Sequence, residues 1–216
     1  MQTRRRFVRN SAIVLGAGAV GVGFTPAPTK AALGSRHCTS KRPMGHKTLV
    51  AYASRHGSTA DIAHTIAEQL CAKGGNADAR WIGDIHAVQD YDAVIIGSAI
   101  RYDKWLPEAT EFVQTHHSAL SNMPVALFLC CLAASSTSEK AARQTHTYAQ
   151  KVAAQLPTVT PDQVGQFAGV LDYGKMPRTM RLLARGLFAF LGVNEGDYRD
   201  WDAIRSWAKA IPALTS

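Results

Sequence analysis

Short apolar segments alternate with longer segments of mixed polarity along most of the chain. Five of the apolar segments have the length of β-strands, and three of them are apolar at nearly every position, as strands covered on both faces of a sheet are. These segments are 47–53, 77–82, 92–98, 124–132 and 165–171. Strands separated by longer amphipathic stretches predict βαβ units around a parallel sheet.

The stretches between these strands carry apolar side chains at helical spacing. Ile62, Ile66 and Leu70 recur at i, i+4 and i+8 after the first strand. Comparable positions follow the third and fourth strands and end the chain: Phe112 and Val113; Tyr148, Val152 and Leu156; Trp201, Ile204, Ala208 and Ile211. The sequence therefore predicts an α/β fold with a doubly wound, five-stranded parallel sheet and helices on both faces, in one domain over 47–216.

The first 34 residues have the order of an export signal: a basic head, an apolar stretch over 12–24 and a tail of small residues and prolines. The apolar stretch is too short to span a bilayer. Arg4 and Arg5 in the head resemble the twin-arginine signal. The sequence predicts export, to the periplasm or to the membrane if the segment is retained as an anchor. A linker over 35–46 is expected before the domain.

Gly16, Gly18 and Gly21 in this segment have the G-x-G-x-x-G spacing of a dinucleotide-binding turn. That turn needs a buried strand before it, a helix after it and a carboxylate about 20 residues further on. Here cationic residues precede the glycines, prolines follow them, and the first carboxylate of the chain is Asp61. The spacing therefore does not predict an NAD site.

The formal excess of positive charge lies entirely in the first 46 residues. They hold eight of the 24 basic side chains and no acidic one, which leaves 16 basic and 16 acidic side chains in residues 47–216. The eight are Arg4, Arg5, Arg6, Arg9, Lys30, Arg36, Lys41 and Arg42. Nucleic-acid binding requires basic residues clustered on the folded domain, so no nucleic-acid partner is predicted.

The cysteines are Cys38, Cys71, Cys130 and Cys131, which are too few and too irregularly spaced to predict a disulfide scaffold. No pair has the C-x-x-C spacing of a zinc site, and no metal site is predicted. Cys130 and Cys131 end an apolar strand, where burial as small hydrophobic side chains is expected.

The first strand is followed by the loop SRHGST, which leads into a helix. Sheets of this kind bind ligands at the carboxyl ends of their strands, and hydroxyl groups and backbone N–H groups at a helix start suit a phosphate. The residues predicted to hold it are Ser54, Arg55, His56, Gly57, Ser58 and Thr59. The alternative is an ordinary helix start at which Ser58 or Thr59 is the N-cap. The spacing of a P-loop is absent, which argues against nucleoside triphosphate hydrolysis.

The third and fourth strands end in GSAIRY (97–102) and CCLAASS (130–136). Small residues at three successive strand ends, the first suited to phosphate, resemble the flavodoxins. Together with HHSALSNMP (116–124) and QTHTYAQK (144–151), GSAIRY more closely resembles the menaquinone-dependent protoporphyrinogen IX dehydrogenase family, flavodoxin-like enzymes of haem synthesis. The resemblance runs from about residue 47 to the end of the chain, and it implies the strand order 2-1-3-4-5.

The resemblance also implies FMN as the cofactor, with its phosphate in the first loop and its isoalloxazine ring between the other two. Tyr102 is expected to stack on the ring, because the third loop has no aromatic side chain. Arg101 is expected to stabilise anionic reduced flavin or to orient an acidic substrate, the alternative being a solvated surface arginine. Backbone N–H groups expected at the ring edge are those of Gly97, Ser98, Ala99, Leu132, Ala133 and Ala134.

The expected function is that of an FMN-binding oxidoreductase with a quinone or another redox partner, the flavin carrying the redox chemistry. An export signal departs from the resembled family, which acts at the cytoplasmic face of the membrane. One alternative is an exported electron-transfer protein without a small-molecule substrate of its own, and another is a flavin-free interaction module. Balanced charge argues against the electron carrier, because carriers of this fold present a strongly acidic surface.

Residues 175–192 add an amphipathic segment after the fifth strand. Its apolar positions are Met180, Leu183, Leu187 and Phe190, and its basic positions are Arg178, Arg181 and Arg185. One interpretation is a helix that packs on the domain with solvated arginines. The other places the segment at the membrane surface or over the flavin, with its apolar side toward a quinone or lipid.

Overall fold

The computed structural model describes residues 34–38, 46–136, 138–154, 156, 159–175, 178–190 and 193–211. The predicted export signal lies outside these residues except for Gly34, and the glycine motif within it lies outside them entirely. The chain divides into two units, one of Pro28–Gly169 with Tyr198–Ser216 and the other of Met1–Ala27 with Val170–Asp197.

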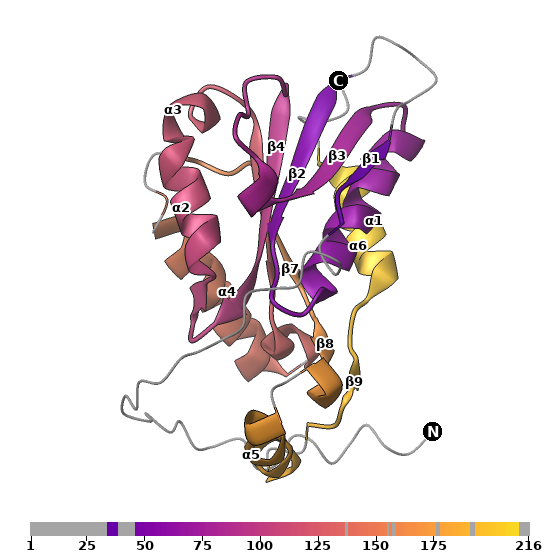
Figure 1. The fold of residues 1–216 in the computed structure, drawn as a ribbon, viewed down its shortest axis with the longest axis vertical. Coiled ribbons are helices and arrows are strands. Elements are labelled where there is room, and N and C mark those ends of the chain that lie inside the picture. The colour runs from indigo at the N-terminus through magenta and orange to yellow at the C-terminus, as the bar shows by residue number, and fades with distance from the viewer. Residues whose placement is uncertain are drawn as a thin grey trace. The chain divides into compact units, whose positions relative to one another are not determined.

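A parallel sheet of five strands, counted over the described residues, forms the centre of the larger unit (Figure 1). In spatial order its strands are β3 (Asn76–Trp81), β2 (Lys47–Ala53), β4 (Ala93–Arg101), β6 (Val125–Cys130) and β7 (Gln163–Phe167). Numbered along the chain this order is 2-1-3-4-5, so the predicted fold and strand order are confirmed. The short strands β1 (Arg36–Cys38) and β5 (Lys104–Trp105) pair antiparallel with β3 and β4.

Helices cover both faces of this sheet (Figure 1). The helices described in the larger unit are α1 (Ser58–Ala72), α2 (Pro107–Thr115), α3 (His117–Leu120), α4 (Glu139–Ala154) and α6 (Trp201–Ala210). Val50 and Tyr52 of β2 pack in a buried cluster with α1 and α6, whereas Leu49 and Ala51 pack in a second cluster with α2 and α4. Alternate side chains of one strand therefore serve opposite layers, which explains why β2 is apolar almost throughout.

The prediction for the fifth strand was wrong at its end. The expected 165–171 is divided between β7, which ends at Phe167, and β8 (Val170–Leu171), which belongs to the smaller unit and pairs antiparallel with β9 (Gly196–Asp197). The Tyr198 N–H donates to the Gly169 carbonyl at the point where the chain leaves the sheet. Hydrophobicity continues across this boundary, so the apolar pattern alone does not mark where the parallel ladder stops.

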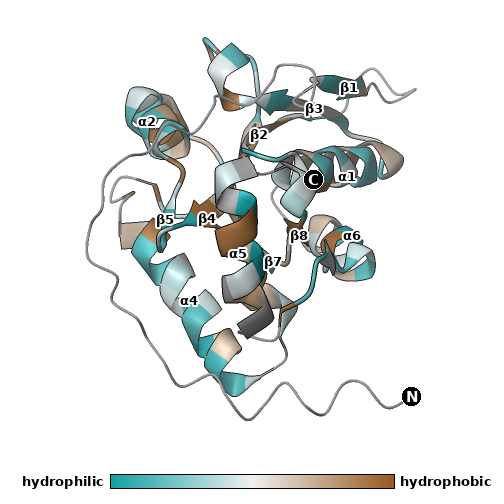
Figure 2. Ribbon diagram, turned by 60° about the horizontal axis from the view of Figure 1, so that its bottom comes forward, coloured by the Kyte–Doolittle hydropathy of each residue, from teal (hydrophilic) through white to brown (hydrophobic). Residues whose placement is uncertain are grey.

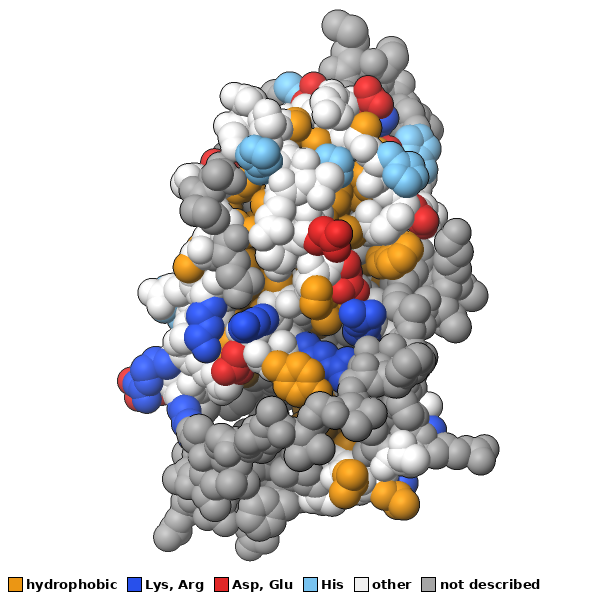
Figure 3. Space-filling view, turned by 60° about the vertical axis from the view of Figure 1, so that its left-hand side comes forward, with side chains coloured by type: hydrophobic (Ala, Val, Ile, Leu, Met, Phe, Trp, Pro, Cys, Tyr) orange, Lys and Arg blue, Asp and Glu red, His pale blue; other side chains and the backbone are white. Residues whose placement is uncertain are grey.

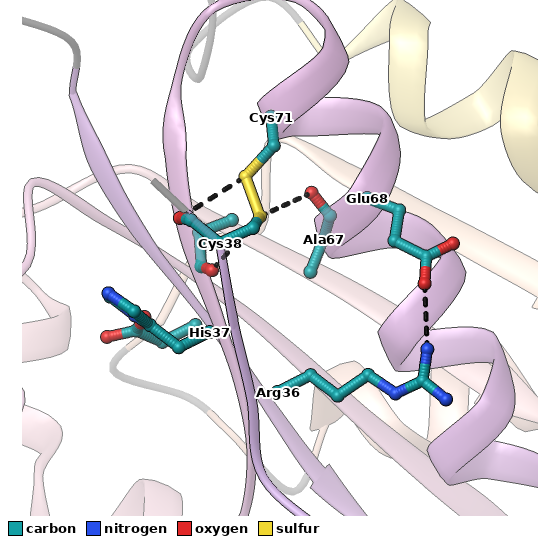
Figure 4. Close-up of a disulfide and its surroundings, with 8 residues drawn as sticks. Arg36, His37, Cys38, Ala67, Glu68 and Cys71 are labelled. Carbon is teal, nitrogen blue, oxygen red and sulfur yellow. Dashed lines mark hydrogen bonds and ion pairs between the residues drawn. A yellow bond between two sulfur atoms is a disulfide. The ribbon is translucent and has the colours of Figure 1, made fainter. Parts of the chain in front are cut away.

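Strand β1 lies within the range expected to be a linker and carries a disulfide (Figure 4). Cys38 is bonded to Cys71 on α1, with their Cα atoms 6.4 Å apart. Arg36 pairs with Glu68 at 2.9 Å, and His37 pairs with the largely buried carboxylate of Asp78 on β3. The cysteine count correctly argued against a multi-disulfide scaffold, but it gave no sign of this single bond, which depends on an unpredicted edge strand.

The smaller unit contains β8, β9, a single helical turn η4 (Tyr173–Lys175) and helix α5 (Arg178–Phe190). Glu195 accepts a hydrogen bond from the Tyr173 N–H at 2.9 Å, and Arg181 donates to the Gly174 carbonyl at 3.0 Å. Leu182 and Leu183 are each 78% exposed, and hydrophobic and hydrophilic residues both appear along α5 in Figure 2. Among the described residues, no helix has the length and apolar content needed to cross a membrane.

Candidate functional site

The loops that follow β2, β4 and β6 lie together at the carboxyl ends of these strands, because the three strands are parallel neighbours. They contain most of the residues expected to hold the cofactor, whereas Gly97, Ser98 and Ala99 lie within β4 itself. Each loop is built differently, and the differences decide which groups are available to a ligand.

The first loop turns sharply from β2 into α1. Gly57 is the N-cap of α1 in the left-handed conformation, with φ at 92°, and no side chain caps the helix start. The buried Ser54 hydroxyl accepts a hydrogen bond from the Gly57 N–H at 3.0 Å and so fixes the turn. Ser58 and Thr59 are therefore the first helical residues and not the N-cap, which removes the ordinary-cap interpretation. An uncapped helix start presents N–H groups and the positive end of the helix dipole to an anion.

The Thr59 hydroxyl is fully buried and has no conventional hydrogen-bond partner among the residues described. The polar group beside it is the Cys130 thiol, a weak partner, whose Sγ lies 4.0 Å from the Ser58 Oγ. Burial raises the pKa of the Cys130 thiol to about 11, against the opposing influence of the two hydroxyl groups. A buried hydroxyl that lacks a strong partner at a helix start fits a phosphate oxygen.

Arg55 connects this first loop to the next layer. Its Nη2 lies 3.1 Å from the Glu108 carboxylate in the first turn of α2, and both side chains are largely buried. Its Nε is buried and has no hydrogen-bond partner within the described part of the chain. The guanidinium group is thus held in place by Glu108, a residue that the sequence analysis did not single out, and keeps one donor for a ligand.

The second predicted loop begins inside β4, because this strand continues to Arg101 and includes Gly97 and Ser98. The Ser98 hydroxyl is buried and accepts from the Leu106 N–H at 3.1 Å. A Cβ atom on Gly97 would lie 1.9 Å from the Phe128 ring, so this position needs glycine for strand packing alone. The backbone of Gly97 and Ser98 lies in the parallel sheet between β2 and β6, and their expected contact with the flavin ring stays a prediction.

The β4–β5 hairpin presents Tyr102 and Arg101. Tyr102 and Asp103 form its turn with φ at 50° and 63°, and the Tyr102 ring is 82% exposed. The Arg101 guanidinium lies 5.2 Å from the centre of that ring. Asp103 also pairs with Lys151 of α4 at 3.5 Å. The exposed Tyr102 ring is available for stacking on a planar ligand.

The third loop is the short helical turn η3 (Leu132–Ser135). The Cys131 N–H donates to the Phe167 carbonyl at 3.0 Å and ties the loop to β7. The Ala134 N–H donates to the Cys131 carbonyl at 3.3 Å, so one of the expected ring-edge donors already has an acceptor within the loop.

On the face drawn in Figure 3, acidic and basic side chains are interspersed.

Comparison with known proteins gives a consistent family. The flavodoxin domain profile matches residues 49–192. The chain is 31% identical over 180 residues to protoporphyrinogen IX dehydrogenase [quinone] of Escherichia coli K12, covering 78% of this chain and 96% of that protein. It is 33% identical over 176 residues to the protein of the same name from Leishmania major, covering 78% and 75%.

Solved structures of flavodoxins are also similar. A short-chain flavodoxin associated with a bacterial microcompartment gives a TM-score of 0.49 at 9% identity and covers 79% of this chain and 99% of that one. A flavoprotein from Lactobacillus acidophilus in complex with FMN gives 0.45 at 13% identity and covers 56% and 93%.

Proposed function

The chain belongs to the flavodoxin domain family, and we propose that it is an FMN-dependent oxidoreductase that passes electrons from a protoporphyrinogen-type substrate to a quinone. The observation that carries the cofactor assignment is the uncapped start of α1 with the buried Thr59 hydroxyl. The substrate and acceptor follow from the relatives named protoporphyrinogen IX dehydrogenase [quinone], one of which is matched over 96% of its length.

The chain's own residues have distinct parts in this proposal. Ser58, Thr59 and the N–H groups of the first turn of α1 bind the phosphate, and the Arg55 Nε adds a donor. Tyr102 stacks on the flavin ring, while Arg101 stabilises negative charge on the reduced ring or on a substrate carboxylate. FMN, when bound, supplies the redox chemistry.

A flavin titration tests the phosphate site. Replacing both Ser58 and Thr59 with alanine removes two hydrogen bonds to a charged group, each worth roughly 1.5–3 kcal/mol, so FMN affinity should fall about tenfold or more for each. Thr65→Ala is the matched control, because its hydroxyl lies on the same helix and donates to the Asp61 carbonyl. Riboflavin should bind the parent protein much more weakly than FMN. Unchanged FMN affinity in the double variant would refute the phosphate assignment.

An electron carrier is the second candidate function, and it differs by having no substrate of its own. Residues 47–216 hold equal numbers of acidic and basic side chains, which disfavours docking through a single-sign field. Anaerobic incubation of the FMN-loaded protein with protoporphyrinogen IX and a menaquinone analogue separates the two functions. Repeated formation of protoporphyrin supports the enzyme, and its absence together with rapid electron exchange with a carrier protein supports the alternative.

We also propose export by the twin-arginine route, on the strength of Arg4 and Arg5. The Cys38–Cys71 disulfide supports export from the cytoplasm, because disulfides persist in oxidising compartments. Cells that carry lysine at both arginine positions should retain the full-length protein. Processed protein outside the cytoplasm in that variant would rule out the twin-arginine route.

Helix α5 is proposed to contact the membrane surface. Leu182 and Leu183 are exposed on a helix that carries three arginines, which suits an anionic lipid surface. Each basic residue near such a surface is worth about 1 kcal/mol, so changing Arg178, Arg181 and Arg185 to glutamine should lower partitioning onto phosphatidylglycerol vesicles roughly a hundredfold at low salt.

The control for vesicle binding removes the same charge elsewhere: Lys140, Arg143 and Lys209 are exposed basic residues of the larger unit. Their change to glutamine should have a much smaller effect. Equal vesicle sedimentation and equal quinone reduction for the parent protein and the α5 variant would leave α5 with a structural role alone.

A further inference from the structure

An acidic side chain lies in the helical turn that is proposed to hold the FMN phosphate. Asp61 is in the first turn of α1, and its N–H donates to the Gly57 carbonyl at 3.0 Å. A phosphate monoester carries a charge of about −1.5 to −2 at neutral pH. A carboxylate close to the same helix start repels that charge, and the repulsion opposes the helix dipole.

Arg199 offsets the charge of Asp61. Its Nη1 lies 2.7 Å from the Asp61 carboxylate, although the two residues are 138 positions apart in the sequence. The Arg199 side chain is only 11% exposed, while that of Asp61 is 56% exposed. The guanidinium group also lies 4.3 Å from the ring centre of Trp201, which holds it as a cation on an aromatic face.

The backbone on both sides of Arg199 is fixed. The Tyr198 N–H donates to the Gly169 carbonyl at 3.1 Å, and the Asp200 side chain caps α6 by accepting from the Ala203 N–H at 2.9 Å. A guanidinium group anchored in this way keeps its position without a large loss of side-chain freedom when a ligand binds.

Gly169, which accepts the hydrogen bond from Tyr198, lies next to Ser58 of the phosphate loop and to Cys130. A Cβ atom on Gly169 would lie 2.9 Å from the Cys130 Sγ and 3.5 Å from the Ser58 Oγ. The positive charge of Arg199 also acts to lower the pKa of the Cys130 thiol, in opposition to burial. The charge of Arg199 therefore acts on the thiol that lies next to the Ser58 hydroxyl.

We propose that Arg199 is a specificity-determining residue for the phosphorylated flavin, because it neutralises Asp61 beside the phosphate and so favours FMN over riboflavin. This inference rests on the proposed FMN site. It assigns no direct hydrogen bond from Arg199 to the phosphate.

Titration of the flavin-free full chain with FMN and with riboflavin tests the proposal in four variants. R199Q should weaken FMN binding about tenfold and leave riboflavin binding unchanged, and the loss should shrink at high salt because the effect is electrostatic. R199K should keep most of the FMN affinity. D61N in the R199Q background should restore it, since the repelling charge is then gone. R205Q is the matched control, because Arg205 forms a comparable 2.8 Å pair with Asp202 on α6.

The outcomes separate this inference from the proposed function. Failure of the parent protein to bind FMN overturns both. FMN binding by the parent with unchanged affinity in R199Q overturns the inference alone, and so does an equal loss of FMN and riboflavin, which would mark a structural role. Thermal unfolding of the flavin-free variants checks folding, and the D61N/R199Q double variant keeps the test decisive if R199Q alone is unstable.

Discussion

Opening the Cys38–Cys71 disulfide is expected to destabilise the protein by an amount that follows from loop length. The bond closes a loop of 33 residues. The loss of chain entropy that such a closure imposes on the unfolded state corresponds to about 3.7 kcal/mol at 25 °C. For a domain of this size, 1 kcal/mol shifts the melting temperature by about 2–4 °C, so Cys38→Ser should lower it by roughly 7–15 °C.

The assay is thermal unfolding of the flavin-free protein with and without a reductant. The reductant should shift the parent protein to the melting temperature of Cys38→Ser and should leave that variant unchanged. The variant has no disulfide to reduce, because Cys71 has lost its partner and Cys130 and Cys131 are buried and not bonded. Thiol titration in denaturant should count two groups before reduction and four after it. A reductant-induced shift below about 2 °C in a parent protein that passes the thiol count would refute the reasoning.

Three further outcomes are expected. Gly97→Ala places a methyl group on the Phe128 ring, where a Cβ atom would lie 1.9 Å away, and should cost about 1–3 kcal/mol of unfolding free energy in urea; an unchanged midpoint would contradict it. Gly57→Ala forces a side chain into the left-handed conformation at φ 92° and should cost about 1–2 kcal/mol and weaken FMN binding, as measured by calorimetry. Burial raises the pKa of Tyr52 to about 12 from 10.0, so the folded protein retains this proton longer than the unfolded chain does. Its contribution to stability should be complete below pH 10 and disappear as the pH rises to 12, with tyrosinate absorbance appearing late; ionisation of all tyrosines near pH 10 in the folded state would oppose this.

The sequence predicted those parts of the fold that depend on burial. Strand β2 matches the predicted 47–53. Both of its faces are covered, and a strand covered on both faces is apolar at nearly every position, which makes it recognisable in the sequence. Strand β1 was missed because Arg36, His37 and Cys38 show no apolar periodicity. Pairing with β3, the side-chain pairs of Arg36 and His37, and the disulfide hold this strand, and all of them depend on distant residues.

The candidate site was likewise predictable only where its residues are close together in the sequence. Local composition identified the loop 54–59, since hydroxyl groups between a strand and a helix are visible within a short window. Glu108 and the Arg199–Asp61 pair were not identified, because only the sheet topology brings these side chains to the loops. The N-cap of α1 is Gly57 and not Ser58 or Thr59, the two residues that the alternative interpretation had offered. A candidate site within one loop can thus be proposed from the sequence, whereas an ion pair between distant segments cannot.

Strand β1 has a consequence for aggregation. Without it, β3 would be the outer strand of the sheet and would present unpaired N–H and C=O groups to other molecules. The three residues of β1 cover Ala77–Ala79, and two of them, Arg36 and His37, bring polar side chains to the new border. Because the disulfide fastens this short strand, an oxidising environment keeps the border closed. Proteolytic trimming beyond Cys38 would remove β1 and expose the edge of β3 as a template for strand addition.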